Sequence, residues 1–375
     1  MKTSTKISIG VILLAAIIGV TWIVVMQEPQ SKAPMKIGVI APLTGPVGVI
    51  GQYMQEGLLL AQREINERGG IQGRSLELVF EDTIVDPKLS VSAMQKFIDI
   101  DNIKVVIGDY RSSNTLAVAP IAEEKKVILI SPGSQADSLS EAGDYIFRTQ
   151  VTAEVEAEKL ADVIKNQLEE TQVSTIVTNQ DYGISFEEKF TIFFKEKGGR
   201  VLLNNRAETQ ETDYRTMLLK SKEKGIDMIV LAVGGLAGGL IANQAKELGL
   251  SFTFVASSII QTGELLEVGK GNVEGFLYVY PYAHMTKEQE VFTQNYKKAY
   301  GRENEVIAAN SYDALMLAAE AIEMCEEDTS CIKDELYEVK NYSGASGVLS
   351  FDENGDVIKP LIIKTVKDGK FVSVM

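Results

Sequence analysis

Residues 105–134, VVIGDYRSSNTLAVAPIAEEKKVILISPGS, contain one complete unit of the fold. An apolar run ends at Gly108, a stretch with the apolar spacing of a helix follows, and a second apolar run begins at Val127. Continuous apolar strands separated by helices are typical of parallel sheets that are covered by helices on both faces. The stretch therefore predicts a strand–helix–strand unit of an α/β fold.

The same alternation occupies the chain before this unit. We expect strands at 36–43 and 76–82 and helices at 53–70 and 87–100. The pattern then restarts near residue 173 and continues as strand and helix to residue 256, and two further helices and a strand-rich C-terminus follow. Two series of similar length predict an α/β fold of two similar doubly wound parallel-sheet lobes.

The N-terminal residues 7–26, ISIGVILLAAIIGVTWIVVM, carry no charge. At ~1.5 Å per residue, such a helix spans the ~30 Å hydrocarbon core of a bilayer. Lys2 and Lys6 precede it, which places the chain after residue 27 outside the cytoplasm. The run exceeds the ~7–15 apolar residues of a cleaved signal and lacks a small-residue cleavage site. We expect an uncleaved transmembrane anchor, with a cleaved signal as the alternative.

The composition limits the partners of this exported part. The 375 residues carry a net charge of −15, which disfavours nucleic acid because phosphate binding needs a basic face. Cys325 and Cys331 are the two cysteines of the chain, and outside the cytoplasm we expect them to form a disulfide. In a reducing compartment they would be free thiols. Two cysteines and one histidine do not suggest a metal site, and no cofactor is expected.

Known catalytic motifs are absent from the sequence. There is no G-x-G-x-x-G, no G-x-x-x-x-G-K-[ST], no G-x-S-x-G and no H-E-x-x-H. The single histidine, His284, lies in a polar loop and has no nucleophile elbow to serve. With 52 Asp and Glu, counting cannot exclude a catalytic carboxylate pair. We nevertheless expect a binding protein rather than an enzyme.

Polar side chains follow the expected strand ends, where open parallel sheets bind ligands. They are Tyr110, Arg111, Ser112 and Ser113 after one strand, and Ser131 and Ser134 after the next. Ser112 or Ser113 would start a helix, whose free N–H groups and positive dipole end favour an anion such as a carboxylate. Arg111 could clamp that anion. The alternatives are a serine that only caps its helix and a solvated arginine; the second serine pair favours the anion site.

Several motifs occur in order between residues 36 and 374. They are IGVIAPLTGP, REINERGGIQGRSLELVFED, VVIGDYRSSNTLAVAPIAEEKKV, LISPGS, DYIFRT, DYG, QAKELGL, VEGF, SYDA and FDENGD. Together they resemble the extracytoplasmic solute receptors of ABC transporters, in the branched-chain amino acid (Leu/Ile/Val) binding group. The resemblance implies a type I periplasmic-binding fold, with crossovers near Gln150, Pro281 and Ser346. The expected units are 1–34 for the anchor and linker, 35–150 plus 282–345 for the first lobe, and 151–281 plus 346–375 for the second.

The resemblance also implies roles for particular residues. Residues at the positions of Ser112, Gly133 and Gln135 hold the solute's α-carboxylate and amine, and Tyr182 covers the solute from the second lobe. The chain departs from this pattern at Ser258, where amino-acid binders carry an acid for the ammonium, at Gly234, often an aromatic, at Gln135, usually threonine, and at Arg111, usually neutral. An unpaired buried ammonium is costly. Either another acid serves, Asp109 being nearest to the serines, or the solute lacks an α-amine.

The sequence thus predicts a membrane-anchored receptor that captures a small carboxylate-bearing solute, an amino acid or a related compound, for an ABC importer. The expected ligand-binding residues are Tyr110, Arg111, Ser112, Ser113, Gly133, Ser134, Gln135, Tyr182, Gly234 and Ser258. The expected partners are the solute, an ABC permease and, through the N-terminal helix, the membrane. The alternatives are a ligand-sensing ectodomain that reports to a membrane partner and an enzyme on the same fold.

Overall fold

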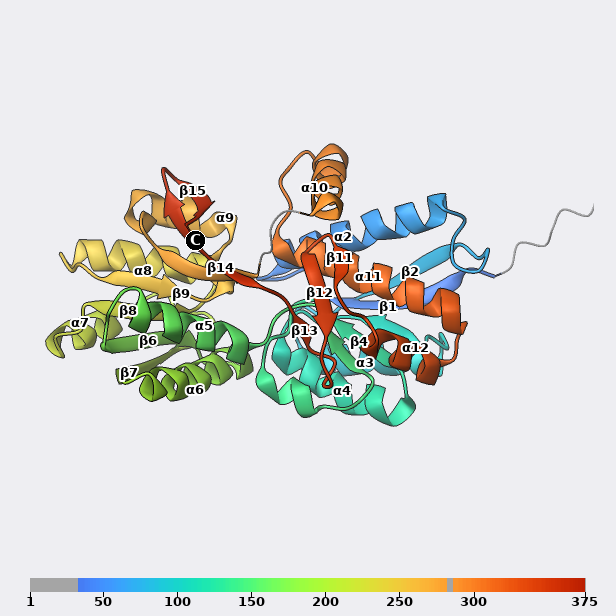
Figure 1. The fold of residues 1–375 in the computed structure, drawn as a ribbon, viewed down its shortest axis with the longest axis horizontal. Coiled ribbons are helices and arrows are strands. Elements are labelled where there is room, and N and C mark those ends of the chain that lie inside the picture. Colours follow the sequence, from blue (N-terminus) through green and yellow to red (C-terminus); the bar gives the residue numbers. More distant parts are fainter. Residues whose placement is uncertain (1–32, 282–285, 375) are drawn as a thin grey trace, which may run out of the picture.

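A computed structural model describes residues 33–281 and 286–374. These residues form two α/β lobes that lie side by side (Figure 1). The expected anchor, residues 7–26, and His284 lie outside the described part. Within the described ranges, no helix is both long enough and apolar enough to cross a bilayer.

The first lobe is built on a five-stranded sheet with the order β2-β1-β3-β4-β5. Its strands are β1 (Met35–Ala41), β2 (Leu76–Asp82), β3 (Val105–Ile107), β4 (Ile128–Ser131) and β5 (Ile146–Arg148). All neighbouring strands are parallel, as the apolar runs predict. The unit quoted from residues 105–134 is the centre of this sheet, because β3 and β4 are neighbours.

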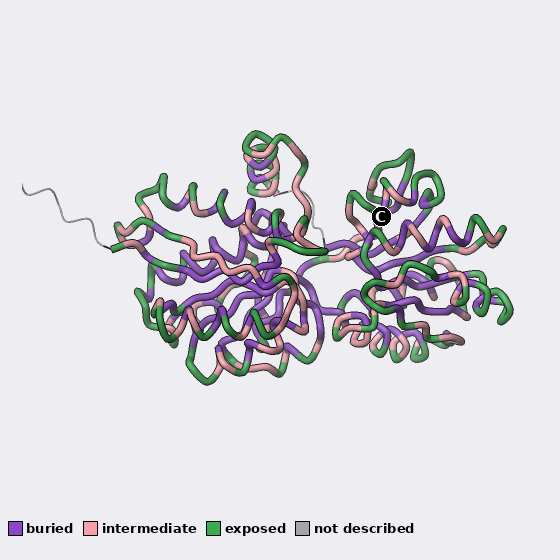
Figure 2. The backbone as a smooth tube through the Cα atoms, turned by 180° about the vertical axis from the view of Figure 1, so that it is seen from behind, coloured by how far each residue is buried: buried purple, intermediate pink, exposed green. Residues whose placement is uncertain are grey.

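Helices cover both faces of the first sheet. They are α2 (Gly48–Glu67), α3 (Pro87–Asp99), α4 (Ser112–Lys125), α11 (Val306–Cys325) and α12 (Thr329–Tyr337), with α10 (Lys287–Tyr300) and the short η1 (Asp137–Glu141) at the periphery. Side chains alternate along β1: Ile37 and Val39 pack with α2 and α11, whereas Ile40 packs with α3 and α4. The inner strands are accordingly buried while the edge strand β2 is half-buried, and exposed positions lie mainly on helices and loops (Figure 2).

The second lobe has a seven-stranded sheet with the order β15-β14-β10-β9-β8-β6-β7. Its strands are β6 (Gln172–Thr178), β7 (Arg200–Ala207), β8 (Met228–Ala232), β9 (Thr253–Ala256), β10 (Leu277–Pro281), β14 (Leu361–Lys367) and β15 (Lys370–Ser373). β6 to β10 are mutually parallel, but β14 and β15 add to the edge antiparallel. The lobe is therefore a mixed sheet rather than a purely parallel one.

Helices again cover both faces of this sheet. They are α5 (Ala153–Asn166), α6 (Asp181–Glu196), α7 (Arg215–Glu223), α8 (Gly235–Glu247) and α9 (Gly263–Gly269), with the short η2 (Ser258–Ile260) and η3 (Lys270–Val273). α5 and α6 pack on one face around Phe186 and Phe190, and α7, α8 and α9 pack on the other.

The chain's last change of lobe lies later than the sequence indicates. A small antiparallel sheet of β11 (Tyr342–Gly344), β12 (Gly347–Phe351) and β13 (Val357–Ile358) follows α12. Leu349, Phe351 and Val357 belong to the first lobe's core, and the Phe351 ring meets the Phe147 ring edge-on at 5.4 Å. The expected crossover near Ser346 is therefore wrong, and the chain enters the second lobe only at β14.

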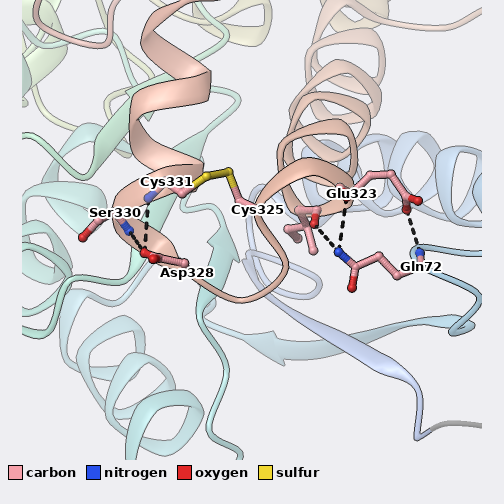
Figure 3. Close-up of a disulfide and its surroundings, with 7 residues drawn as sticks. Gln72, Glu323, Cys325, Asp328, Ser330 and Cys331 are labelled. Atoms are coloured by element: carbon pink, nitrogen blue, oxygen red, sulfur yellow. Dashed lines mark hydrogen bonds between the residues drawn. A yellow bond between two sulfur atoms is a disulfide. The ribbon is translucent and has the colours of Figure 1, made fainter.

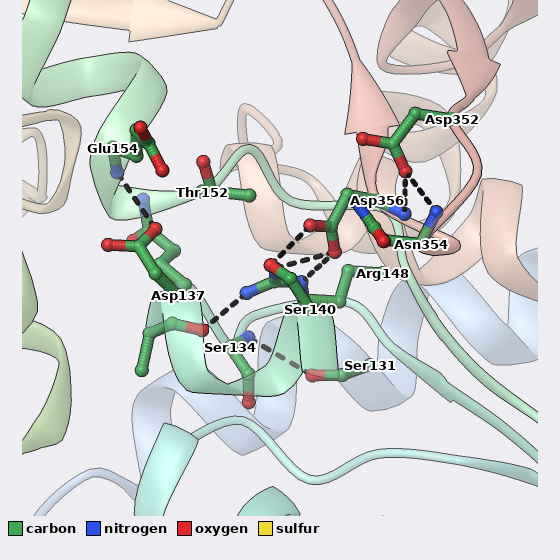
Figure 4. A network of polar contacts seen from close by, with 12 residues as sticks. Ser131, Ser134, Asp137, Ser140, Arg148, Thr152, Glu154, Asp352, Asn354 and Asp356 are labelled. Carbon is green, nitrogen blue, oxygen red and sulfur yellow. Dashed lines mark hydrogen bonds and ion pairs between the residues drawn. The ribbon is translucent and has the colours of Figure 1, made fainter. Parts of the chain in front are cut away.

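Buried charges tie the first and last crossovers together. Arg148, only 1% exposed, donates from Nε to Asp356 at 2.6 Å, and its other nitrogens reach the Ala136 carbonyl and Ser140. Figure 4 shows this network from close by. Lys359 donates to the carbonyl of Thr149 at 2.7 Å, to Asn310 and to Ser346. Each cation thus has several acceptors at these crossovers, which form the hinge between the two lobes.

The expected disulfide is formed between Cys325 and Cys331, whose Cα atoms lie 5.5 Å apart. It closes the turn between α11 and α12, and the Asp328 carboxylate caps α12 by accepting from the N–H groups of Ser330 and Cys331 (Figure 3). Gln72 fastens the end of α11 to the loop before β2, since its side chain donates to the carbonyls of Ile322 and Glu323.

Candidate functional site

The junction between β3 and α4 is shaped by a glycine. Gly108 has φ +131°, and a Cβ there would lie 2.0 Å from the Ile40 carbonyl oxygen. Arg111 occupies the N-cap of α4 without a side-chain capping bond, and Ser112 is the first helical residue. The alternative that Ser112 only caps its helix is therefore wrong.

The Ser112 hydroxyl instead connects two neighbouring strand ends. Its Oγ accepts from the backbone N–H groups of Gln135 at 3.2 Å and Ala136 at 3.1 Å, in the loop after β4. Because both bonds use Oγ as acceptor, the hydroxyl hydrogen remains available to donate to an anion. Ser113 is partly exposed, and its hydroxyl lies 3.4 Å from the Asn114 side-chain oxygen.

The loop after β4 packs closely under this junction. A Cβ on Gly133 would lie 2.6 Å from the Tyr110 ring, so only glycine lets the ring approach. The Ser134 side chain is fully buried and lies 2.7 Å from the Thr115 hydroxyl, while its N–H donates to Ser131. Ser134 therefore supports the loop, whereas the Gly133 backbone lies beside Tyr110.

The Asp109 side chain supports the β3–α4 junction from inside the first lobe. Its carboxylate accepts from Ser90 at 2.9 Å, from Asn114 at 3.0 Å and from the Tyr110 N–H, and the side chain is fully buried. Burial raises the pKa of Asp109, and these hydrogen bonds act against the increase. The suggestion that Asp109 is the acid nearest to the serines, free to meet an ammonium, does not agree with this arrangement.

A different carboxylate, Glu156 on α5, contacts two of the three predicted residues of the second lobe. It is fully buried and accepts from the Ser258 hydroxyl, from the Ser258 N–H at 3.4 Å and from the Tyr182 hydroxyl at 3.2 Å. Burial raises the pKa of Glu156 to about 7, although the surrounding donors oppose this increase. Burial and the neighbouring Glu156 carboxyl also raise the pKa of Tyr182.

Residues of the first lobe reach this cluster. The Gln135 amide is close enough to Glu156 to lower its pKa, yet its buried nitrogen makes no hydrogen bond of good geometry within the described residues. Tyr110 lies near enough to Tyr182 to influence its pKa. Beside them, the Ser185 hydroxyl of α6 meets Asp137 of η1, and Asp137 also accepts from the Glu154 N–H. The strand ends of both lobes therefore meet around Glu156.

Two predicted residues stand apart from this cluster. Gly234 is the N-cap of α8, and a Cβ built on it would have no atom within 4 Å in the described structure. The Arg111 guanidinium makes no hydrogen bond or ion pair with any described residue, and burial raises the pKa of the adjacent Tyr110 although the Arg111 charge opposes this increase. Arg111 is thus at the site's edge with an uncommitted guanidinium.

Glu156 is not among the site residues that the sequence predicts. It lies in AEVEAEK, where three glutamates alternate with small residues and resemble a solvated charged face. One signal was present: Glu156, Ala157, Leu160, Ala161 and Ile164 follow helical spacing, so the glutamate falls within the buried stripe of α5. Among the described residues, no group of three or more His, Cys, Asp or Glu could hold a metal ion.

Comparison with known proteins gives the family. A model of the periplasmic binding protein family matches residues 34–370. The chain belongs to that family. This periplasmic binding protein is 26% identical over 344 residues to the Leu/Ile/Val-binding protein homolog 3 of Brucella melitensis, covering 91% of this chain and 93% of that protein. It is 27% identical over 330 residues to the leucine-, isoleucine-, valine-, threonine- and alanine-binding protein of Pseudomonas aeruginosa, covering 86% and 87%.

Solved structures of periplasmic binding proteins share the two-lobed architecture. A leucine binding protein from Thermotoga maritima superposes with a TM-score of 0.84 at 29% identity, covering 91% of this chain and 98% of that one. A solute binding protein from Rhodopseudomonas palustris in complex with benzoate has a TM-score of 0.83 at 18% identity, covering 91% and 95%, and shows the shared fold.

Proposed function

We propose that this chain is an extracytoplasmic receptor that captures a small carboxylate-bearing solute between its lobes and delivers it to an ABC importer. The single observation that carries this proposal is the Ser112 hydroxyl, which accepts two backbone N–H groups and keeps its hydrogen for an anion. Two relatives are named as binding proteins for leucine, isoleucine and valine, and these names support a solute of amino-acid size.

Three features favour a carboxylate at this position. Ser112 begins α4, where unpaired N–H groups and the helix dipole favour negative charge. Arg111, directly before it, has a guanidinium without another partner among the described residues. The Gly133 backbone lies beside this junction under Tyr110. A planar carboxylate can use a hydroxyl, backbone N–H groups and a guanidinium fork together.

The test is Ser112→Ala, with Ser113→Ala as the matched control on the next residue. A hydrogen bond to a charged group contributes about 1.5–3 kcal/mol. Ser112→Ala should therefore weaken binding roughly ten- to a hundredfold, whereas Ser113→Ala should change it by less than about threefold. The twenty proteinogenic L-amino acids and benzoate serve as probes, first by thermal shift and then by calorimetric titration. Equal affinities of both variants and the parent chain would place the carboxylate site elsewhere.

We also propose that residues 7–26 anchor the receptor in the cell membrane. The support is the uncharged run of these residues preceded by Lys2 and Lys6. The full chain should sediment with membranes and resist extraction at high salt, whereas a chain that starts at Ala33 should not. Release of the full chain in soluble form with a new N-terminus after residue 26 would show cleavage instead.

A further inference from the structure

No cationic side chain among the described residues pairs with the buried Glu156 carboxylate. Its neighbours are the Ser258 hydroxyl and N–H, the Tyr182 hydroxyl and the Gln135 amide, and all of these are neutral. A lone charge removed from water is costly unless an opposite charge compensates for it. The buried Asp356 carboxylate, by contrast, pairs with the Arg148 guanidinium.

The donors around Glu156 indicate the form in which it works. Ser258 and Tyr182 donate to it, and the Gln135 amide lies close by. The Ser258 N–H can only donate, and an ionised carboxylate can accept from it and from both hydroxyls at once. Three donated hydrogen bonds also leave an acceptor site on a carboxylate, which offers about four. The surroundings therefore suit an ionised Glu156 with one open position.

The open acceptor position of Glu156 lies between the two lobes, beside the proposed carboxylate site. Its donors come from both lobes, because Gln135 follows β4 while Tyr182 and Ser258 follow β6 and β9. Gln135 also gives its N–H to Ser112, the proposed carboxylate contact, so the two ends of a small solute would lie on either side of one residue. The Gln135 side-chain nitrogen is also buried and makes no hydrogen bond in the described structure.

We infer that Glu156 binds the ammonium group of the solute, and that the solute is therefore an amino acid rather than an amine-free carboxylate. The inference rests on the proposed function, since the carboxylate end is placed at Ser112. Ser258 occupies the position at which amino-acid binders carry the acid for the ammonium. It does not contact the ammonium itself but orients Glu156 through its hydroxyl and N–H. The acid has thus been moved from the loop after β9 to the helix α5.

Proton linkage gives an independent readout of this role. Burial raises the pKa of Glu156 to about 7, so at pH 6 most ligand-free molecules carry a proton on it. An ammonium must displace that proton, and binding is therefore weaker at low pH. Affinity for an amino acid should rise about tenfold between pH 6 and pH 8, with proton release on binding near pH 7.

The experiment compares the full chain with Glu156→Gln and with Glu158→Gln, an exposed glutamate two residues along the same helix. The probes are the twenty L-amino acids and, for each that binds, the same carbon chain with hydrogen in place of the amine. Removing one partner of a buried charge pair should weaken amino-acid binding about a hundredfold or more and abolish its pH dependence. Glu158→Gln should leave both unchanged.

The outcomes separate this inference from the proposed function. An amino acid that binds Glu156→Gln as tightly as the parent chain overturns the ammonium role. Binding of only amine-free carboxylates such as benzoate overturns the inference but retains the proposed function, provided that Ser112→Ala weakens it. Binding of neither class overturns both.

Discussion

Two buried charge clusters lie a few residues apart in this chain and are built in opposite ways. At the hinge, Arg148 and Lys359 are each surrounded by acceptors, including the Asp356 carboxylate and the Thr149 carbonyl. At the site, the partners of Glu156 within the described part of the chain are all neutral donors. The first cluster is complete within the chain, whereas the second is complete only with a cation from outside. Charge compensation thus distinguishes a structural cluster from a binding cluster.

The largest effect should follow from breaking the complete cluster. Arg148→Ala leaves Asp356 buried without its cation, and such a loss costs about 3–5 kcal/mol. The free energy of unfolding, measured by urea denaturation at pH 7, should fall by that amount.

The matched control is Arg215→Ala, which removes an exposed arginine that also pairs with carboxylates, those of Asp213 and Glu247. Its effect should stay below about 1 kcal/mol. Similar losses in both variants would show that the Arg148 pair contributes no more than a surface pair.

Neutralising the incomplete cluster should have the opposite sign. The folded pKa of Glu156 is about 7, above the ordinary value of 4.5, so the folded chain holds its proton more tightly than the unfolded chain. Above pH 7 the ionised side chain destabilises the ligand-free fold by up to ~3 kcal/mol. Glu156→Gln should therefore stabilise the ligand-free chain at pH 8, and this gain should fade as the pH falls from 7 to 4.5.

Unfolding curves of the ligand-free chain at pH 8 and pH 5 test this difference, with Glu158→Gln expected to stay within about 0.5 kcal/mol. A loss of stability at pH 8 would mean that Glu156 is a structural group, and the contrast between the two clusters would fail.

A smaller effect should come from the disulfide, which lies away from both clusters. The Cys325–Cys331 loop is short, so a Cys325→Ser/Cys331→Ser double variant should lose about 2 kcal/mol. Solute affinity should not change, because neither sulfur contacts a site residue in the described structure. In the presence of a strong reductant, the parent chain should match the variant; a persistent difference would assign the loss to side-chain packing instead.

Much of the site could be predicted because it follows from strand order. Once β3 and β4 are neighbouring parallel strands, the residues after them must adjoin, and the Ser112–Gln135 contact follows. The family resemblance supplies Tyr182 and Ser258, which lie after β6 and β9 of the second sheet. Repeating apolar runs and helix stops carry this information locally in the sequence.

Glu156 and the last crossover depend on tertiary contacts instead. Glu156 comes from a helix side rather than a strand end, and its burial depends on Ser258, 102 positions away in the sequence. The sequence of residues 347–358 predicts strands but does not indicate which lobe they join, since both lobes offer an apolar edge. Their assignment to the first lobe comes from tertiary packing, in which Leu349, Phe351 and Val357 join the first lobe's core.

The late return of the chain to the first lobe has a consequence for the order of folding. α2 buries Met54, Leu58 and Ala61 partly against α11, which begins about 250 residues later at Val306. Contacts of such long range form slowly, because a large loop must close first. During export, α2 therefore emerges without its cover, while the second lobe can assemble from a nearly continuous stretch. In pulse-labelled refolding, amide protection of α2 should appear together with that of α11, and later than that of α5 and α6.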